Sequence, residues 1–240
     1  MNDWALVGHD GTRARAFALS GTAVMRAADG TDSASALAAL GTVPGRLLRV
    51  GEGQPDALPA PLLPDAARQG LAGLIQKTPP DVIDGWTRLL LLGVVRDRPN
   101  WEGIACVLAG DVRHWVHLSA GEAVSCQSFL SPRLAATLGG TTAPDMTALS
   151  DSLSRPERLA AHLRSAEVTG DSAAISGHLL GAELAAARPY WLGQSVAVIA
   201  AAAAGSDVTD ALAAQGVPTN AIDPETLLAP AVAALADWMG

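Results

Sequence analysis

Two segments of the sequence place aspartate and glycine at a bend between two stretches that read as β-strands. In VGHDGTRARAFALSG the bend is formed by Asp10, Gly11 and Thr12, and in LAGDVRHWVHLSAG it is formed by Gly110 and Asp111. A tight bend with glycine can point backbone N–H groups at phosphate oxygens, and a nearby carboxylate can hold Mg²⁺. These residue types therefore fit the binding of a nucleotide's phosphates together with a magnesium ion.

Glycine and aspartate also favour ordinary turns, so either bend taken alone favours a purely structural role. The repetition changes this balance, because the order strand, bend, strand, turn, strand, helix occurs near the N-terminus and again after residue 100. Two such units predict an α/β protein of two similar domains, 1–98 and 99–240, that face each other across a cleft. The two bends would then clasp the phosphates from opposite sides.

The elements that position these bends follow from apolar periodicity and from turn residues. The sequence predicts strands at 5–8, 13–19, 22–28, 46–53, 103–110, 113–119, 122–129 and 194–206. Capping residues predict three helices: one after Asp32 or Ser33, one after Thr78 with Pro79 in its first position, and one after Ser131. Apolar periodicity predicts further helical structure through 150–190 and helices at 207–216 and 224–238. Four prolines within 55–64 predict a rigid connector without regular structure.

Charge and composition disfavour several classes of function. The formal net charge is −8 and 49% of the residues are hydrophobic, so nothing favours binding to nucleic acid or to an anionic membrane. The longest apolar run is interrupted by Gly205 and is too short to span a bilayer, and the start of the sequence does not read as a signal peptide. Cys106 and Cys126 are too few for a disulfide framework, which is typical of reduced thiols in a cytoplasmic protein.

Three segments carry a family resemblance: GHDGTRARAF near the start, AGDVRHWV in the middle, and HLLGAEL followed by AVIAAAAAGSDVTDAL near the end. Their order and spacing resemble the 2-dehydro-3-deoxygalactonokinases of the actin-like sugar-kinase superfamily. The family has Asp-Trp-Gly-Ser/Thr-Thr before Leu-Arg-Ala-Trp, then Pro-Gly-Thr-His-x-Lys-Trp-Val, and finally Leu-Leu-Ile-Gly-Ala-Glu before a strand that closes on Gly-Ser. The resemblance extends over nearly the whole chain.

The resemblance implies two ribonuclease-H-like (actin-like ATPase) domains with a cleft between them. It implies transfer of the γ-phosphate of ATP to the 6-hydroxyl of 2-dehydro-3-deoxy-galactonate, with ATP and Mg²⁺ as cofactors. The expected partners are therefore a small sugar acid and a nucleotide, and a homodimer is one assembly that the resemblance allows.

The bends and the resemblance together predict roles for individual residues. The carboxylates of the two bends, Asp10 and Asp111, are expected to be catalytic, and Asp10 is expected to hold the metal. The nucleotide is expected to contact Gly11, Thr12, Gly110, Gly205 and Ser206, and the substrate is expected to contact Arg15 and Glu183. Glu183 lies in an apolar helix, where a carboxylate is uncommon unless it is paired, so it either faces the cleft or pairs with Arg188.

The chain departs from the family at several polar positions. The family's first-loop aspartate falls on Gly8, and its Arg-Gly-Glu-Glu becomes DGWT at 84–87. The family's Thr-His becomes Asp111-Val112, Thr-Gly-Glu-Leu becomes SPRL at 131–134, and the proline-rich connector stands where the family has a longer segment. Phosphoryl transfer needs carboxylate-held Mg²⁺ and a group that orients the attacking hydroxyl. A second hypothesis is therefore a non-catalytic relative that binds a nucleotide, a sugar acid or a partner protein.

Overall fold

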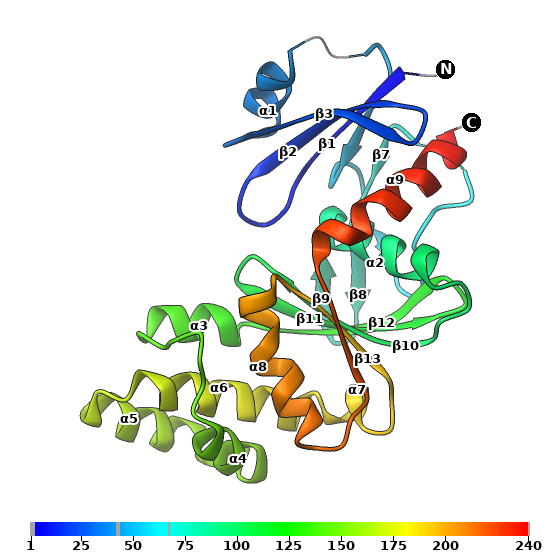
Figure 1. The fold of residues 1–240 in the computed structure, drawn as a ribbon. Helices are drawn as coiled ribbons and strands as arrows, with labels where there is room; N and C mark the ends of the chain where they lie inside the picture. The colour runs from blue at the N-terminus through cyan, green and yellow to red at the C-terminus, as the bar shows by residue number, and fades with distance from the viewer. Residues whose placement is uncertain (1–2, 42–43, 67, 240) are drawn as a thin grey trace. The chain divides into compact units, whose positions relative to one another are not determined.

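A computed structural model describes residues 3–41, 44–66 and 68–239 and has a mixed α/β architecture (Figure 1). The chain forms two compact units. Unit 1 contains Met1–Glu102, Leu118–Cys126 and Pro224–Gly240, and unit 2 contains Gly103–His117 and Gln127–Asp223. Among the described residues, no helix has the length and apolar character needed to cross a membrane.

The larger sheet of unit 1 has five strands in the order β3-β2-β1-β4-β7. These strands are β1 (Asp3–His9), β2 (Ala14–Ser20), β3 (Ala23–Gly30), β4 (Leu47–Val50) and β7 (Gly70–Leu71). Helix α1 (Ser33–Leu40) covers one face, where the small side chains of Ala14, Ala16 and Ala36 allow close packing. Asp32 caps this helix by accepting from the backbone of Ser35, which confirms one of the two predicted caps.

Unit 1 also contains a small sheet and a pair of packed helices. The sheet has the order β5-β8-β9 and consists of β5 (Asp56–Ala57), β8 (Leu74–Lys77) and β9 (Pro80–Ile83). Helices α2 (Gly85–Asp97) and α9 (Pro224–Met239) pack together. A Cβ atom at Gly93 would lie 2.4 Å from the carbonyl oxygen of Leu227, so only glycine permits this close approach.

The sheet of unit 2 places strands β14-β13-β10-β11 side by side, with β13 parallel to both of its neighbours. The strands are β10 (Gly103–Ala109), β11 (Val112–Ser119), β13 (Val196–Ile199) and β14 (Thr219–Ile222). The next strand, β12 (Glu122–Phe129), begins in unit 1, where Glu122 and Ala123 pair with β6 (Ala60–Pro61). The predicted second series of strand, bend and strand is therefore confirmed.

Most of the helices of unit 2 lie in one group, shown in green and yellow in Figure 1. They are α3 (Ser131–Thr137), α4 (Met146–Ser154), a 3₁₀ turn (Pro156–Arg158), α5 (Leu159–Thr169), α6 (Ser172–Ala186) and α7 (Arg188–Trp191), and α8 (Ala202–Ala213) follows β13. Ser131 is the first helical residue of α3 rather than its cap, and no side chain caps that helix.

Two further predictions were wrong about where a helix begins. Residues 74–83 form the β8–β9 hairpin, so the helix predicted from Thr78 begins only at Gly85, where the Asp84 carboxylate accepts from the Thr87 backbone N–H. The strand predicted at 194–206 ends at Ile199 and its alanine-rich second half is helical. Alanine is the strongest helix former, so once the strand leaves the sheet this run favours a helix.

The proline-rich connector is held by a buried cation rather than by regular structure. It contributes only the two-residue strands β5 and β6, a small correction to the prediction of none. The side chain of Arg88 in α2 is fully buried and donates to the carbonyl oxygens of Pro61, Leu62 and Ala72. It also donates to a carboxylate oxygen of Asp56 at 2.8 Å. These bonds fix Asp56, Pro61, Leu62 and Ala72 against the first turn of α2.

We expect Arg88→Met to lower the free energy of unfolding by about 3–5 kcal/mol, because it leaves a carboxylate and several carbonyl groups without a donor. Urea unfolding of the purified protein measures this loss. Arg68→Met is the matched control: Arg68 binds the other oxygen of Asp56 but is exposed, and its loss should cost less than about 1 kcal/mol. Equal effects of the two variants would contradict the role given to Arg88.

Candidate functional site

A pocket in unit 2 lies at the end of strand β10, beside α3, α6 and α8. Its volume is about 210 Å³. Leu108 at the end of β10, Ala204 and Asp207 of α8, and Ser176 of α6 contribute to its wall, as do α3 and residues 140–142. In open α/β sheets, ligands bind beyond the carboxyl ends of the parallel strands. This position at the end of β10 makes the pocket a candidate ligand site within unit 2.

Arg113 of β11 lines the pocket and is held by an acidic residue from α6. Its Nη1 donates to Glu183 Oε2 at 3.0 Å, and the other oxygen of Glu183 accepts from Trp115 Nε1 at 2.9 Å. The Arg113 side chain is 7% exposed, and Glu183 is buried. Glu183 therefore pairs with Arg113, and the predicted pairing with Arg188 is wrong. Both oxygens of Glu183 are engaged inside unit 2.

Asp207 of α8 completes this charged cluster. Its Oδ2 lies 3.7 Å from Arg113 Nη2, and its Oδ1 accepts from the backbone N–H of Val208 at 2.7 Å. Burial raises the pKa of Asp207, while the nearby Arg113 charge partly opposes this rise. Burial lowers the pKa of Arg113, but the charges of Glu183 and other nearby groups together with the hydrogen bond to Glu183 outweigh it, and the net shift is upward. The pocket thus contains a permanent cation beside a carboxylate of reduced acidity.

The predicted nucleotide residues Gly205 and Ser206 lie within α8 instead of at the end of a strand. They line a second hollow of about 340 Å³, together with Thr209, Asp210 and residues from the ends of β13 and β14. The residues that directly follow β13 are Ala200 and Ala201.

The bend between β10 and β11 consists of Gly110 and Asp111. Gly110 has a φ of 59°, a left-handed conformation that glycine adopts readily. The exposed carboxylate of Asp111 makes two hydrogen bonds with Arg133 of α3, at 2.6 and 2.8 Å. These bonds lower the pKa of Asp111. Asp111 is therefore ionised and paired at the surface of unit 2.

The first bend is closed by its own hydrogen bonds. Asp10 Oδ1 accepts from the backbone N–H groups of Thr12 and Arg13 and from the Thr12 hydroxyl. The N–H of Gly11 donates to the ring of His9, and the N–H of Asp10 donates to the Arg13 carbonyl. Burial alone raises the pKa of Asp10, but the bonds from Thr12 and Arg13 outweigh it and the net shift is downward. The expectation that the backbone N–H groups of this bend are free to bind phosphate is therefore wrong.

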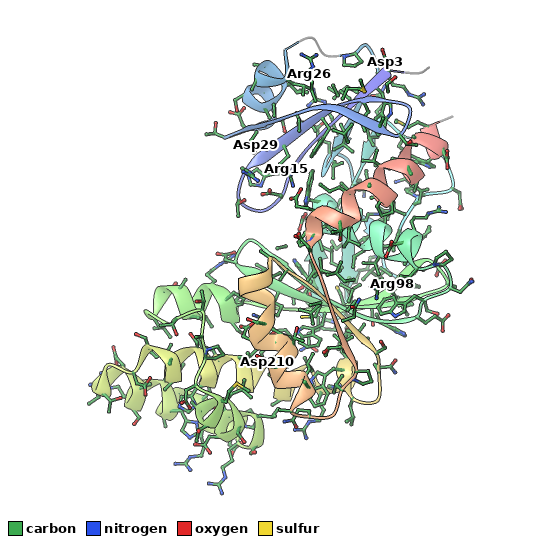
Figure 2. The ribbon with its side chains drawn as sticks, in the orientation of Figure 1. Asp3, Arg15, Arg26, Asp29, Arg98 and Asp210 are labelled. Carbon is green, nitrogen blue, oxygen red and sulfur yellow. The ribbon has the colours of Figure 1, made fainter. Side chains whose placement is uncertain are left out.

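Arg15 follows the bend on β2 and is also engaged within unit 1. It makes a two-pronged ion pair with Glu225 of α9, and its guanidinium lies 5.2 Å from the ring centre of Phe17 and 5.6 Å from that of Trp86. Asp29 lies on the neighbouring strand, 3.8 Å from Arg15 Nε (Figure 2). The Nε atom is buried without a hydrogen-bond partner.

Trp86 occupies the space next to Gly8, the position at which the sequence analysis expects the counterpart of the family's first-loop aspartate. A Cβ atom at Gly8 would lie 2.9 Å from the Trp86 ring and 2.8 Å from the Val50 Cβ atom. Trp86 is itself buried and stacks on Phe17 with ring centres 6.4 Å apart. A side chain at position 8 is therefore excluded unless Trp86 or its neighbours move.

The cluster of Arg113 and Asp207 was missed by the sequence reasoning, and so was the contact of Trp86 with Gly8. Each pair is distant in sequence, and no local pattern links its members. A weak signal was available, because the two changes at Gly8 and in the DGWT segment both replace family carboxylates. Among the described residues, no group of three or more histidine, cysteine, aspartate or glutamate side chains could hold a metal ion.

Comparison with known families gives a match to part of the chain. A profile of the 2-keto-3-deoxy-galactonokinase family matches residues 146–235. The predicted family resemblance is confirmed. The matched stretch contains Glu183, Gly205, Ser206 and Asp207, whereas the two bends lie outside it. A comparison with curated proteins gave no match.

Solved structures confirm the predicted actin-like ATPase fold. The chain is similar to a Sinorhizobium meliloti protein provisionally named as a 2-dehydro-3-deoxygalactonokinase, with 19% identity, 98% and 99% of the two chains covered, and a TM-score of 0.78. It is also similar to component A of the (R)-2-hydroxyglutaryl-CoA dehydratase of Acidaminococcus fermentans, with 12% identity, coverage of 98% and 97%, and a TM-score of 0.52. A third similar structure is the activator of the 2-hydroxyisocaproyl-CoA dehydratase of Clostridium difficile with bound ADPNP, with 13% identity, coverage of 98% and 94%, and a TM-score of 0.50.

Substitutions at Asp10 separate a structural role from a chemical one. Asp10→Ala removes three hydrogen bonds to the bend and should cost about 1–3 kcal/mol of stability. Asp10→Asn keeps an oxygen that can accept the same bonds and should retain most of that stability. Urea unfolding of both variants is the measurement. Equal losses in the two variants would contradict the structural role of the Asp10 oxygen.

Proposed function

We propose that this protein is a sugar-acid kinase that transfers the γ-phosphate of ATP to the 6-hydroxyl of 2-dehydro-3-deoxy-galactonate or a close relative. The observation that carries this proposal is the family match over residues 146–235, together with a pocket that this same stretch helps to line. The ADPNP bound to one similar structure adds support for a nucleotide as ligand.

In this proposal the pocket of unit 2 receives the nucleotide. Its apolar wall suits a flat ring, and Arg113 and Asp207 supply polar groups that fix orientation. The bend at Gly110 and Asp111 directly follows β10, whose Leu108 lines the pocket, so this bend is the proposed contact for phosphates. Arg15 is the proposed contact for the sugar acid, and it would have to exchange Glu225 for a substrate carboxylate.

The residues present do not fit a magnesium site of the expected kind. Asp10 Oδ1 already accepts three hydrogen bonds, and Oδ2 lies 3.6 Å from the positively charged Arg13 side chain. A cation placed there would meet the guanidinium charge. We therefore assign no step of the reaction to Asp10-bound Mg²⁺.

A non-catalytic relative is the second candidate, and the packing of Trp86 over Gly8 specifically favours it. This packing replaces two family carboxylates by a glycine and an aromatic ring in contact. Losing a group that performs proton transfer typically costs about 10²–10⁴-fold in rate. In this version the protein keeps ligand binding and lacks phosphoryl transfer.

The deciding experiment measures ADP release with 2-dehydro-3-deoxy-galactonate and Mg-ATP. A kinase should release ADP only when the sugar acid is present. Thermal shift with Mg-ATP provides the second measurement, because a ligand at 100 times its Kd stabilises by about 2.7 kcal/mol. ATP binding without turnover would select the non-catalytic relative, and the absence of both ATP binding and turnover would contradict the kinase.

The contact between Gly8 and Trp86 can be tested by a pair of variants. Gly8→Asp alone should destabilise the protein by about 1–3 kcal/mol or more, since the new side chain is forced against the ring. Gly8→Asp combined with Trp86→Ala, which removes the ring, should recover stability relative to the sum of the single changes, as measured by a double-mutant cycle in urea. Simple additivity of the two changes would contradict direct contact.

A further inference from the structure

We propose that Ser152, His162 and His178 form a histidine cluster that holds α5 on α4 and α6 and releases it when both histidines are protonated. Each of the three residues comes from a different helix of the group shown in green and yellow in Figure 1. The inference concerns a pH-sensitive contact within unit 2. It does not depend on the proposed kinase activity or on any ligand.

The hydroxyl group of Ser152 lies between two imidazole rings. Its Oγ is 3.0 Å from His162 Nδ1 and 2.9 Å from His178 Nδ1, and the centres of the two rings are 4.6 Å apart. The side chains of Ser152 and His178 are buried. Among the described residues, the two ring nitrogens are the hydrogen-bond partners of the Ser152 side chain.

The single proton of the Ser152 hydroxyl limits how many protons the two rings can carry. One Nδ1 accepts this proton and is therefore bare, while the other Nδ1 carries a hydrogen that it donates to Oγ. A further proton on the accepting ring would leave the buried hydroxyl without an acceptor, which costs free energy. It would also place two positive charges on rings that are 4.6 Å apart. The cluster therefore tolerates one charged histidine and not two.

The surroundings of His178 disfavour its charged form. Burial lowers the pKa of His178, and the charge of His162 lowers it further. The carbonyl group of Ala148 and the carboxylates of Asp151 and Asp145 act in the opposite direction but are outweighed. The other charged side chains on the elements that pack against α6 are exposed, so water screens them: Arg133, Glu157, Arg158, Arg164, Glu167 and Arg188.

This lowered pKa fixes the direction of the pH dependence. A histidine whose pKa is lowered by folding binds fewer protons in the folded state than in the unfolded state. The contribution of His178 to stability is therefore fully present above the ordinary histidine pKa of about 6.5 and is lost as the pH falls below it.

Helix α5 is the element that depends most on the histidine cluster. Within α5, all of which the structure describes, Ala166 is the only buried residue, and it packs against Ile175 and Leu179 of α6. Helices α4 and α6 are in much closer contact, because a Cβ atom at Gly181 would lie 2.2 Å from the carbonyl oxygen of Leu149. Loss of the cluster should therefore release α5 while α4 and α6 remain packed together.

Hydrogen exchange of the unmodified protein tests this release. Between about pH 7.5 and about pH 5, amide protection in α5 should fall by about tenfold after correction for the intrinsic exchange rate, because one proton is taken up on opening. Protection in α6 should be retained. Unchanged protection in α5, or an equal loss in α5 and α6, would overturn the inference.

Replacement of each histidine tests whether both are needed. His178→Asn keeps an oxygen that can accept from Ser152 but cannot be protonated. Below about pH 6.5 the unfolding equilibrium constant of the unmodified protein, measured in urea, should therefore rise by up to about tenfold per pH unit more than that of the variant. His162→Asn should also reduce the acid sensitivity, because it removes the second charge. His117→Asn is the matched control, since His117 is half-buried on β11 and outside the cluster, and it should leave the acid sensitivity unchanged.

Nitrogen chemical shifts of the two rings provide a measurement that needs no variant. At about pH 7.5, one of the two histidines should have a bare Nδ1 and the other a protonated Nδ1, because they share one hydroxyl. The same protonation state at both Nδ1 atoms would overturn the histidine cluster. Two charged rings at a pH at which the α5 amides are still protected would also overturn it, as would equal acid sensitivity of His178→Asn and the unmodified protein.

Discussion

Burial of the Arg88 guanidinium among main-chain carbonyl groups is the constraint on which unit 1 depends. A fully buried charge is tolerated only when nearly all of its donors are used, and here the acceptors come from a segment with little regular structure of its own. The prolines of that segment remove backbone donors, so its carbonyl groups are free to accept from a side chain. This interaction fixes α2, and α2 in turn carries Trp86 onto Gly8.

In unit 2 a buried arginine is neutralised by carboxylates instead of by main-chain carbonyl groups. Arg113 is balanced by Glu183 and by Asp207, and burying opposite charges together costs less than burying either alone. The two arginines therefore have different consequences. The N–H donors of Arg88 are used by groups of its own unit, so its role is structural. Arg113, in contrast, lines a pocket.

The sequence predicted the elements whose signals are local. Alternating residues and turns at Ser20-Gly21 and Ala120-Gly121 indicated the β2–β3 and β11–β12 hairpins, and Asp32 indicated the start of α1. The start of α2 was misplaced because Thr78 and Asp84 offer the same capping chemistry six residues apart. Pairing between β8 and β9 decided between them, and that pairing has no distinctive local signature.

Candidate site residues were predicted less well than the fold, for a physical reason. A bend such as that at Asp10 can be recognised from its residue types, but whether its amides are free depends on hydrogen bonds that only coordinates reveal. In the alanine-rich run after β13, apolar character alone did not distinguish strand from helix, so the junction with α8 was placed too late. Arg113 and Asp207 come from elements far apart in the chain, and their meeting is a property of the tertiary structure.

The return of α9 to unit 1 has a consequence for biosynthesis. Helix α9 is in close contact with α2, and Gly93 makes this contact possible. Helix α2 is synthesised before most of unit 2, whereas α9 is synthesised after all of it. All of unit 2 is therefore synthesised before the helix that completes unit 1. Unit 1 must keep the apolar face of α2 uncovered until its last helix emerges, an interval in which that nascent surface is open to chaperones.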